Sequence, residues 1–392
     1  MKILQVICSV NPKGGGPIEW IKQIGQVLQK QGHLIEVACL DDPNATWFKT
    51  FPWKIHALGP GVSGYQYSKH FVPWLRQNAA NYDAIVVNGI WQYSSFGVWL
   101  GLMSLRQQGF HTPPYFVFTH GMLDPWFKRT YPLKHLKKWL YWFWAEYRVL
   151  KDASSVLFTC DEERILARES FWLYKCNEIV VNFGTAAPTD DPQAQRQAFL
   201  NQFPQLNGKR LLLFLSRIHA KKGCDLLIEA FAKIASLDDT LHLVMAGPDQ
   251  TGWQVELQLL AKKLDIEQKI TWTGMLCGDL KWGAFYASEV MLLPSHQENF
   301  GIVVAEAIAC GVPVLLSNKV NIWREIATAG AGLVANDDKD GTIKLLQQWL
   351  AMTPDEQQTM RNKAKQCFTQ RFEIHKAAQS LVEVLNNKGV YK

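Results

Sequence analysis

The sequence predicts an α/β protein with two doubly wound parallel sheets, each of the Rossmann-like kind. Its 392 residues exceed a single typical domain of roughly 100–200 residues. In both halves, short apolar runs alternate with amphipathic helical stretches, and the runs end in polar or glycine-rich loops. Strands separated by helices pair in parallel, so this alternation indicates a doubly wound sheet in each half.

The first half opens as a β-α-β unit. Residues 2–9 and 35–40 are apolar runs typical of buried strands, and residues 18–28 carry apolar side chains at helical spacing. In the loop before this helix, Gly15 and Gly16 would let the backbone approach a ligand closely. The loop lacks the G-x-G-x-x-G spacing of dinucleotide sites. Further strands are expected at residues 84–88, 115–119, 155–159 and 179–181.

The expected strand at residues 115–119 ends in Thr119-His120-Gly121. The carboxyl ends of parallel strands form ligand clefts, so His120 is a candidate ligand contact. The alternative is a structural role, which is more common for an isolated histidine.

The segment 126–151 has the most unusual composition in the chain. It carries nine aromatic residues, seven Lys or Arg and one Glu, which concentrates the formal net charge of +6 in one place. Such local charge argues against a protein that coats nucleic acid. After Pro132 the spacing predicts one long helix with a basic outer side that includes Lys134 and Lys138. The opposite side is expected in the core: Leu136, Trp139, Leu140, Phe143, Tyr147 and Leu150.

A second interpretation of this segment is compatible with the first. Lys134, Lys137, Lys138 and Trp139 are candidates for contact with an anionic membrane surface or an acceptor lipid.

A polar stretch with two prolines, residues 185–197, is expected to link two domains. Beyond it the alternation resumes, with strands expected at residues 210–215, 242–246, 270–273, 290–293 and 312–316. This organisation predicts an N-terminal domain over residues 1–187, a second domain over 188–370 and a C-terminal segment over 371–392.

The cysteine pattern and hydropathy bear on location. Eight cysteines form no C-x-x-C pair and several lie in apolar runs, which predicts buried free thiols of a cytoplasmic protein. The apolar start is too short for a signal peptide, and no apolar run reaches the ~20 residues of a membrane span. No Asp-x-Asp follows a strand and no His/Cys cluster has metal-ligand spacing, so no metal is expected.

Two loops of the second half indicate an anion site. Arg217 and Lys222 follow one expected strand, and a helix with free amides at Phe300, Gly301 and Ile302 follows another. Glu298 and Glu306 flank this helix start. Acids beside a bound anion are best placed to accept hydrogen bonds from hydroxyls of the same ligand, as in a sugar attached to a nucleoside diphosphate. The alternative is a set of solvated surface charges.

These motifs resemble a known family. Arg217-x4-Lys222-Gly223 followed by Glu298-x7-Glu306 is similar to the donor-site signature of the retaining nucleotide-sugar glycosyltransferases of family 4. That family has the GT-B fold, in which two Rossmann-like domains face a central cleft. The resemblance implies that the last helix, expected within residues 373–387, crosses back onto the N-terminal domain. Other matching pieces follow the family's order along nearly the whole chain: Gly15-Gly16, Thr119-His120-Gly121, Ala246-Gly247-Pro248 and Thr273-Gly274. Two pieces depart from the family pattern: Ser216, and Val181-Asn182-Phe183-Gly184.

The resemblance implies roles for the matched residues. Arg217 and Lys222 would hold the diphosphate and stabilise it as leaving group. Glu306 would bind the ribose hydroxyls, Glu298 the hydroxyls of the donor sugar, and His120 the sugar near the reacting carbon. The remaining donor contacts would come from the backbone at Gly15, Gly16, Phe300, Gly301 and Ile302 and, facing the base, near Gly247 and Met275.

The implied activity is retaining, metal-independent transfer from a nucleoside-diphosphate sugar to a hydroxyl of a glycan or lipid-linked acceptor. Exopolysaccharide or other cell-surface glycan assembly is the expected setting, at the inner face of the plasma membrane, with no cofactor beyond the co-substrate. The alternatives are a non-catalytic sugar-nucleotide-binding or scaffold protein, and an epimerase or phosphorylase of similar architecture. A nicotinamide-dependent oxidoreductase fits less well, because of the glycine spacing.

Overall fold

The structure, a computed structural model, describes residues 1–387 and divides them into two compact units. Unit 1 comprises Met1–Gly184 and the C-terminal helix from Ile374, and unit 2 comprises Thr185–Glu373. The sequence places these divisions after residues 187 and 370. Residues 388–392, the end of the expected C-terminal segment, lie outside the described residues.

Unit 1 is built on a seven-stranded parallel sheet with the order β3-β2-β1-β4-β5-β6-β7. Every residue of the central strand β4 is buried, as expected where helices cover both faces of a parallel sheet. The strands are β1 (Lys2–Ile7), β2 (Leu34–Cys39), β3 (Lys54–Ala57), β4 (Ala84–Asn88), β5 (Tyr115–Phe118), β6 (Ser155–Phe158) and β7 (Glu178–Val180).

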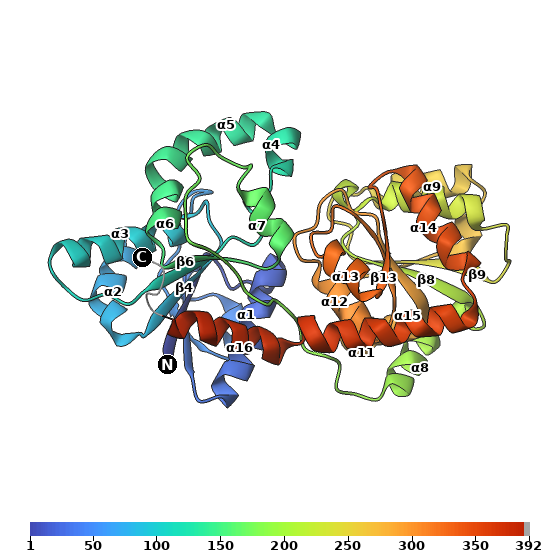
Figure 1. Cartoon of the computed structure of the whole chain (residues 1–392), viewed down its shortest axis with the longest axis horizontal. Helices are drawn as coiled ribbons and strands as arrows, with labels where there is room; N and C mark the ends of the chain where they lie inside the picture. Colours follow the sequence, from blue (N-terminus) through green and yellow to red (C-terminus); the bar gives the residue numbers. More distant parts are fainter. Residues whose placement is uncertain (388–392) are drawn as a thin grey trace. The chain divides into compact units, whose positions relative to one another are not determined.

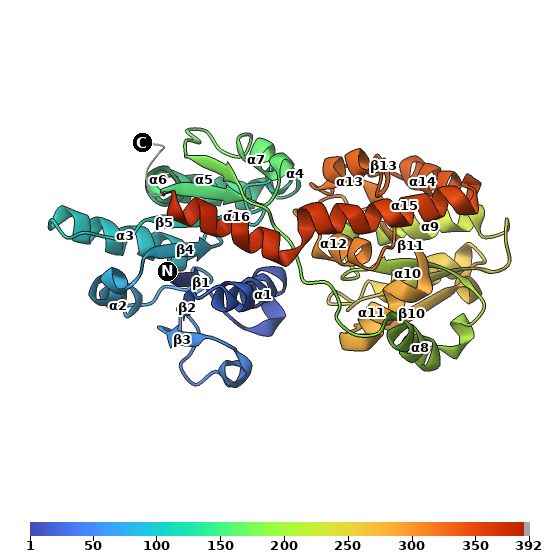
Figure 2. The same cartoon turned by 60° about the horizontal axis from the view of Figure 1, so that its bottom comes forward.

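Helices surround this sheet, and the C-terminal helix α16 lies against α1 (Figures 1 and 2). Both have a strongly apolar side, which accounts for their packing. The main helices are α1 (Gly16–Lys30), α2 (Phe71–Asn78), α3 (Tyr93–Gln107), α4 (Trp126–Thr130), α5 (Pro132–Tyr141), the π-helix η4 (Trp142–Glu146), α6 (Tyr147–Asp152), α7 (Asp161–Ala167) and α16 (Ile374–Asn386).

Unit 2 has a six-stranded parallel sheet with the order β10-β9-β8-β11-β12-β13. The strands are β8 (Arg210–Leu215), β9 (Leu241–Ala246), β10 (Ile270–Gly274), β11 (Ser288–Leu293), β12 (Val314–Ser317) and β13 (Gly332–Ala335). The helices are α8 (Pro192–Gln202), α9 (Cys224–Ile234), α10 (Gln254–Lys263), α11 (Gly278–Ala287), α12 (Ile302–Ala309), α13 (Trp323–Ala329), α14 (Lys339–Ala351) and α15 (Pro354–Cys367). The predicted α/β class with two doubly wound sheets is therefore confirmed.

Both sheets contain the strand-order reversal at which ligands bind in open α/β folds. In unit 1 the order reverses between β1 and β4, and in unit 2 between β8 and β11. The loops that follow these strands leave the carboxyl edge of each sheet, which is the edge where open α/β folds bind their ligands. These loops carry most of the candidate residues.

The expected linker at residues 185–197 is only partly a linker. Helix α8 begins at Pro192, and the side chain of Asp191 caps it by accepting a hydrogen bond from the backbone N of Gln193 at 3.0 Å. Asp followed by Pro is a helix-start signal, and it outweighs the polar composition of this stretch.

The long helix predicted after Pro132 is confirmed, because α5, the π-helix η4 and α6 follow one another without a break from Pro132 to Asp152. The short helix α4 precedes it. The faces of this helix differ from the prediction: Leu136, Trp139, Leu140 and Phe143 are exposed, whereas Ala145 is buried. The wider turn of a π-helix shifts the helical phase, and the apolar side of α5 points away from the core.

Candidate functional site

Two loops meet at the strand-order reversal of unit 2. The first follows β8 and the second follows β11, and three contacts join them. The backbone O of Lys221 accepts hydrogen bonds from Ser295 Oγ at 2.9 Å and from the backbone N of His296 at 2.8 Å. At Gly223, which has φ 67°, a Cβ would lie 2.2 Å from the backbone O of Pro294. Only glycine permits this close approach.

The centre of these loops is an ion pair between Lys222 Nζ and Glu298 Oε2. Lys222 is buried, and Glu298 is partly exposed. Burial alone would raise the pKa of Glu298, but the charge and hydrogen bond of Lys222, with smaller contributions from Lys221 and Arg217, lower it below its usual value. Within residues 1–387, only Oε2 of this carboxylate has a partner, so Oε1 is open to a hydroxyl donor.

Arg217 and the start of α12 complete the positive side of this site. Arg217 is exposed and forms no ion pair with any residue from 1 to 387. Gly301, with φ 71°, lies at the N-terminal end of α12, whose first amides have no acceptor within the helix. The guanidinium and the helix start together suit an anion such as a diphosphate.

Glu306 lies on α12 and is buried. Its Oε1 accepts a hydrogen bond from Lys281 Nζ, on α11, at 2.7 Å. Sequence reasoning missed Lys281, since no spacing signal links α11 to α12.

Gly247 and Met275 follow β9 and β10 at the same edge of the sheet. Gly247 has φ 145°, and a Cβ there would lie 1.7 Å from the backbone O of Ser216. This glycine is therefore required for the packing of the β8 loop. Met275 is highly exposed.

In unit 1, the glycine loop follows β1 and His120 follows β5, at the carboxyl edge of the sheet. Gly15, with φ 79°, precedes the first residue of α1, Gly16, so the amides at the start of this helix lie at the carboxyl end of β1. His120 Nε2 lies 3.2 Å from Asn88 Oδ1, at the end of β4. Its ring stacks on Phe118 with the ring centroids 5.4 Å apart.

Glu163, which sequence reasoning missed, holds the loop of His120. Its Oε1 accepts hydrogen bonds from Thr119 Oγ1 at 2.7 Å and from the backbone N of Gly121 at 2.6 Å, on either side of His120. Its Oε2 accepts two more from Thr159. Such bonds stabilise the left-handed backbone of His120, which has φ 47°.

The environment of His120 predicts a neutral imidazole. Burial lowers the pKa of His120 to about 4. We expect its ring proton resonances, assigned with His120→Gln, to stay constant from about pH 8 to pH 5.5. A midpoint above pH 6 in this NMR titration would contradict the assignment.

The folded pKa of His120 lies below the usual 6.5, so the contribution of His120 to the free energy of unfolding is lost as the pH falls from 6.5 towards 4.

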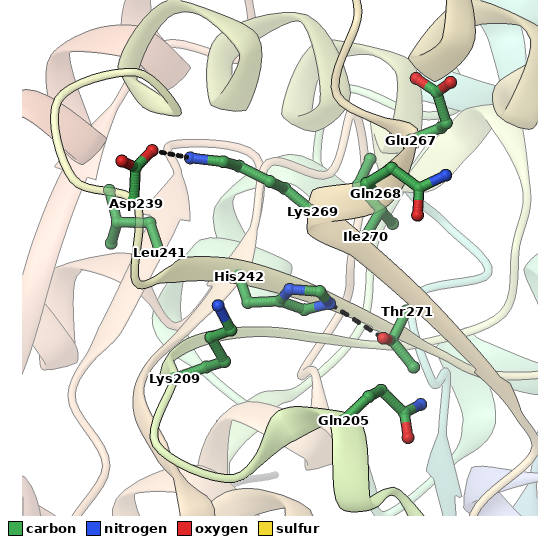
Figure 3. Close-up of a pocket in the computed structure, with 10 residues that line it drawn as sticks. All are labelled: Gln205, Lys209, Asp239, Leu241, His242, Glu267, Gln268, Lys269, Ile270 and Thr271. Atoms are coloured by element: carbon green, nitrogen blue, oxygen red, sulfur yellow. Dashed lines mark hydrogen bonds and ion pairs between the residues drawn. The ribbon is translucent and has the colours of Figure 1, made fainter.

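A hollow of about 340 Å³ lies elsewhere in unit 2 (Figure 3). It is lined by residues at the starts of β9 and β10, among them Leu241, His242 and Ile270. Among these residues, His242 Nε2 forms a hydrogen bond with Thr271 Oγ1 at 2.9 Å. Because these are the amino ends of the strands, the hollow is not part of the site after β8 and β11.

Residues 1–387 contain no group of three or more His, Cys, Asp or Glu side chains placed to hold a metal ion. None of the helices over the same range has the length and apolar character needed to span a bilayer.

Comparison with known families identifies both units. Residues 195–367 match the family described as glycosyl transferases group 1, and residues 15–181 match the glycosyl transferase 4-like domain. The chain belongs to the group 1 glycosyltransferases. Its α/β fold is that of the GT-B glycosyltransferases, since the chain resembles their structures along almost its entire length.

Among solved structures, Anabaena Alr3699/HepE in complex with UDP has a TM-score of 0.77 and 18% identity, covering 98% of this chain and 100% of that chain. Sucrose-phosphate synthase from Thermosynechococcus elongatus has a TM-score of 0.75 and 19% identity, covering 98% of both chains. In sequence, D-inositol 3-phosphate glycosyltransferase of Geodermatophilus obscurus is 37% identical over 112 residues, which are 27% of this chain and 25% of that relative. The chain thus matches about a quarter of this relative's length.

Proposed function

We propose that this group 1 glycosyltransferase transfers a sugar from a nucleoside-diphosphate sugar to an acceptor hydroxyl, with retention of configuration at the anomeric carbon. The observation that carries the proposal is the pair of joined loops after β8 and β11, which gathers Arg217, Lys222 and Glu298 at one strand-order reversal. Cations beside an acid with an open oxygen suit a ligand that combines a diphosphate with sugar hydroxyls.

The mechanism follows from the charges in unit 2. The bond between the anomeric carbon and the phosphate oxygen breaks, and its electron pair goes to that oxygen. Arg217, Lys222 and the amides at Gly301 and Ile302 stabilise this developing charge more than they stabilise the ground state. The acceptor oxygen bonds to the same face of the anomeric carbon, and its proton passes to the departing phosphate oxygen. Positive side chains of the chain itself supply the charge that a divalent metal would otherwise provide.

The other contacts are assigned by the same proposal. Glu298 binds hydroxyls of the transferred sugar, and Glu306 binds the ribose hydroxyls. His120, as a neutral ring, donates or accepts a hydrogen bond at the sugar. The glycine loop at Gly15 and Gly16, with Phe300, contributes backbone contacts, and the backbone at Gly247 and Met275 borders the base.

The acceptor is proposed to be a glycan or lipid-linked hydroxyl compound used in cell-surface polysaccharide assembly, on the cytoplasmic side of the membrane. The basic and aromatic segment 126–151 supports this setting.

Product analysis tests the proposed reaction. The protein would be incubated with single nucleoside-diphosphate sugars and candidate acceptors, with a chelator present, and the anomeric proton coupling of the product measured by NMR. UDP-glucose is the first donor to test, because Anabaena Alr3699/HepE has been solved with UDP and glucose. An inverted product would contradict retention. Binding without turnover would favour a scaffold protein, and interconversion of the donor without transfer would favour an epimerase.

A further inference from the structure

The outer side of α5 and η4 is the most apolar exposed surface that the described chain carries on one helical segment. Leu136, Leu140 and Phe143 are 60%, 63% and 60% exposed. They recur every three or four positions and therefore line one side of the segment. We call this surface the α5 ridge, and its members are Leu133, Leu136, Leu140, Phe143 and Trp144.

The inner side of the same segment packs against the rest of unit 1. Trp142 is buried and stacks on Phe171 with centroids 4.7 Å apart, and His135 stacks on the same ring at 4.5 Å. Lys138 lies over the ring of Trp91 at 4.7 Å, and burial lowers its pKa. Rotating α5 to bury its ridge would expose these groups instead, so the outward position of the ridge is set by packing.

Positive charge borders the ridge. Lys134 and Lys137 are exposed on α5, and four further exposed cations lie in the same segment: Lys128, Arg129, Arg148 and Lys151. The one acid of residues 126–151, Glu146, is buried beneath it, where its carboxylate accepts hydrogen bonds from Trp91 and Ser95. The exposed charge within residues 126–151 is therefore entirely positive, and of these cations Arg129 is paired with the exposed Glu169. Figure 1 shows α5 along the outer edge of unit 1.

We propose that the α5 ridge docks this chain on an anionic lipid surface. An amphipathic helix lies in the membrane interface with its apolar side among the acyl chains and its cations at the headgroups. The ridge provides leucines, Phe143 and Trp144 on one side, and Lys134 and Lys137 are placed to meet phosphates. Lys138, a candidate from the sequence, is excluded because it packs inward on Trp91.

Docking of the ridge rests on the proposed membrane setting of the acceptor, but lipid binding does not require sugar transfer. A lipid-binding test without donor sugar can therefore fail while the proposed glycosyltransferase activity holds, and the reverse.

Vesicle flotation at about 0.15 M salt is the test. Wild-type protein should float with phosphatidylcholine vesicles that contain about 30% phosphatidylglycerol, and should stay at the bottom with phosphatidylcholine alone. Leu140→Ser with Phe143→Ser should lower binding at least about tenfold, since two large apolar groups no longer enter the bilayer. Lys134→Glu with Lys137→Glu should lower binding to the anionic vesicles to a similar extent.

A matched control lies in unit 2. Val255 and Leu259 on α10 are 62% and 63% exposed, and Val255→Ser with Leu259→Ser should float like the wild type. Wild-type protein that does not float, or a ridge variant that floats like the wild type, would overturn the proposal. So would a ridge variant that loses dimers in sedimentation while flotation is unchanged, because the ridge would then bind a second copy of the chain.

Discussion

Lys222→Ala should lower kcat for sugar transfer by at least about a hundredfold, the usual cost of removing one group that stabilises transition-state charge. Lys222 is buried and directed by its ion pair with Glu298, so no neighbouring lysine replaces it at the same position. The loss should appear mainly in kcat, since the charge on the leaving oxygen develops during bond cleavage. Steady-state kinetics with the donor identified by product analysis would measure it.

The loss of kcat in Lys222→Ala must be distinguished from a loss of protein stability. Alanine at position 222 leaves Glu298 without its cation, and breaking a fully buried pair costs about 3–5 kcal/mol. Glu298 is partly exposed, so the cost here should be smaller. The double variant Lys222→Met with Glu298→Gln leaves no unpaired charge, and should fold while remaining inactive.

Lys262 offers the matched control, as an exposed lysine on α10 of the same unit. Lys262→Ala should keep wild-type kinetics. If Lys222→Ala or the double variant retains transfer within about twofold of the wild type, Lys222 has no role at the leaving group.

Gly247→Ala should destabilise unit 2 by about 3 kcal/mol or more, through the steric overlap and the positive φ together. The added Cβ would lie 1.7 Å from the backbone O of Ser216, which is far inside contact distance and leaves the β8 loop no way to keep its position. For a domain of this size the expected fall in Tm is about 6 °C or more. Transfer should decrease as well, since Arg217 follows Ser216 directly.

The variant Gly252→Ala separates the cost of the steric overlap from the cost of the positive φ. It has φ 77°, and nothing lies within 4 Å of the Cβ that alanine would add. Gly252→Ala should therefore cost only about 1 kcal/mol, from the left-handed backbone alone. Equal losses of Tm in the two variants, measured by thermal unfolding, would show that contact with Ser216 is not the reason for glycine at position 247.

Local patterns were enough to predict most strands of both sheets, but not the edge strands β3 and β13. Strand β8 begins and ends at the predicted residues, Arg210 and Leu215. Apolar runs and helical spacing reflect burial of each segment by itself, so they can be recognised without knowing its neighbours. The two loops that hold Arg217 and Glu298 could be placed for the same reason.

Contacts between distant segments could not be predicted. Lys281 reaches Glu306 across 25 positions, and Glu163 reaches Thr119 across 44, with no spacing rule to indicate either pair. The direction of α5 is a further example. Its amphipathic pattern was visible, but the pattern does not state which side faces the protein.

The order of residues along this chain therefore established which side chains stand at the carboxyl ends of its strands. Parallel pairing brings those ends to one edge, and Arg217, Lys222 and Glu298 gather there as a consequence. Tertiary packing decided which residues contact each other: Lys222 pairs with Glu298, and Gly247 packs against Ser216. It also placed Trp142 rather than Leu140 in the core of unit 1. Those choices depend on shape and charge in segments far apart in sequence, which come into contact only in the folded chain.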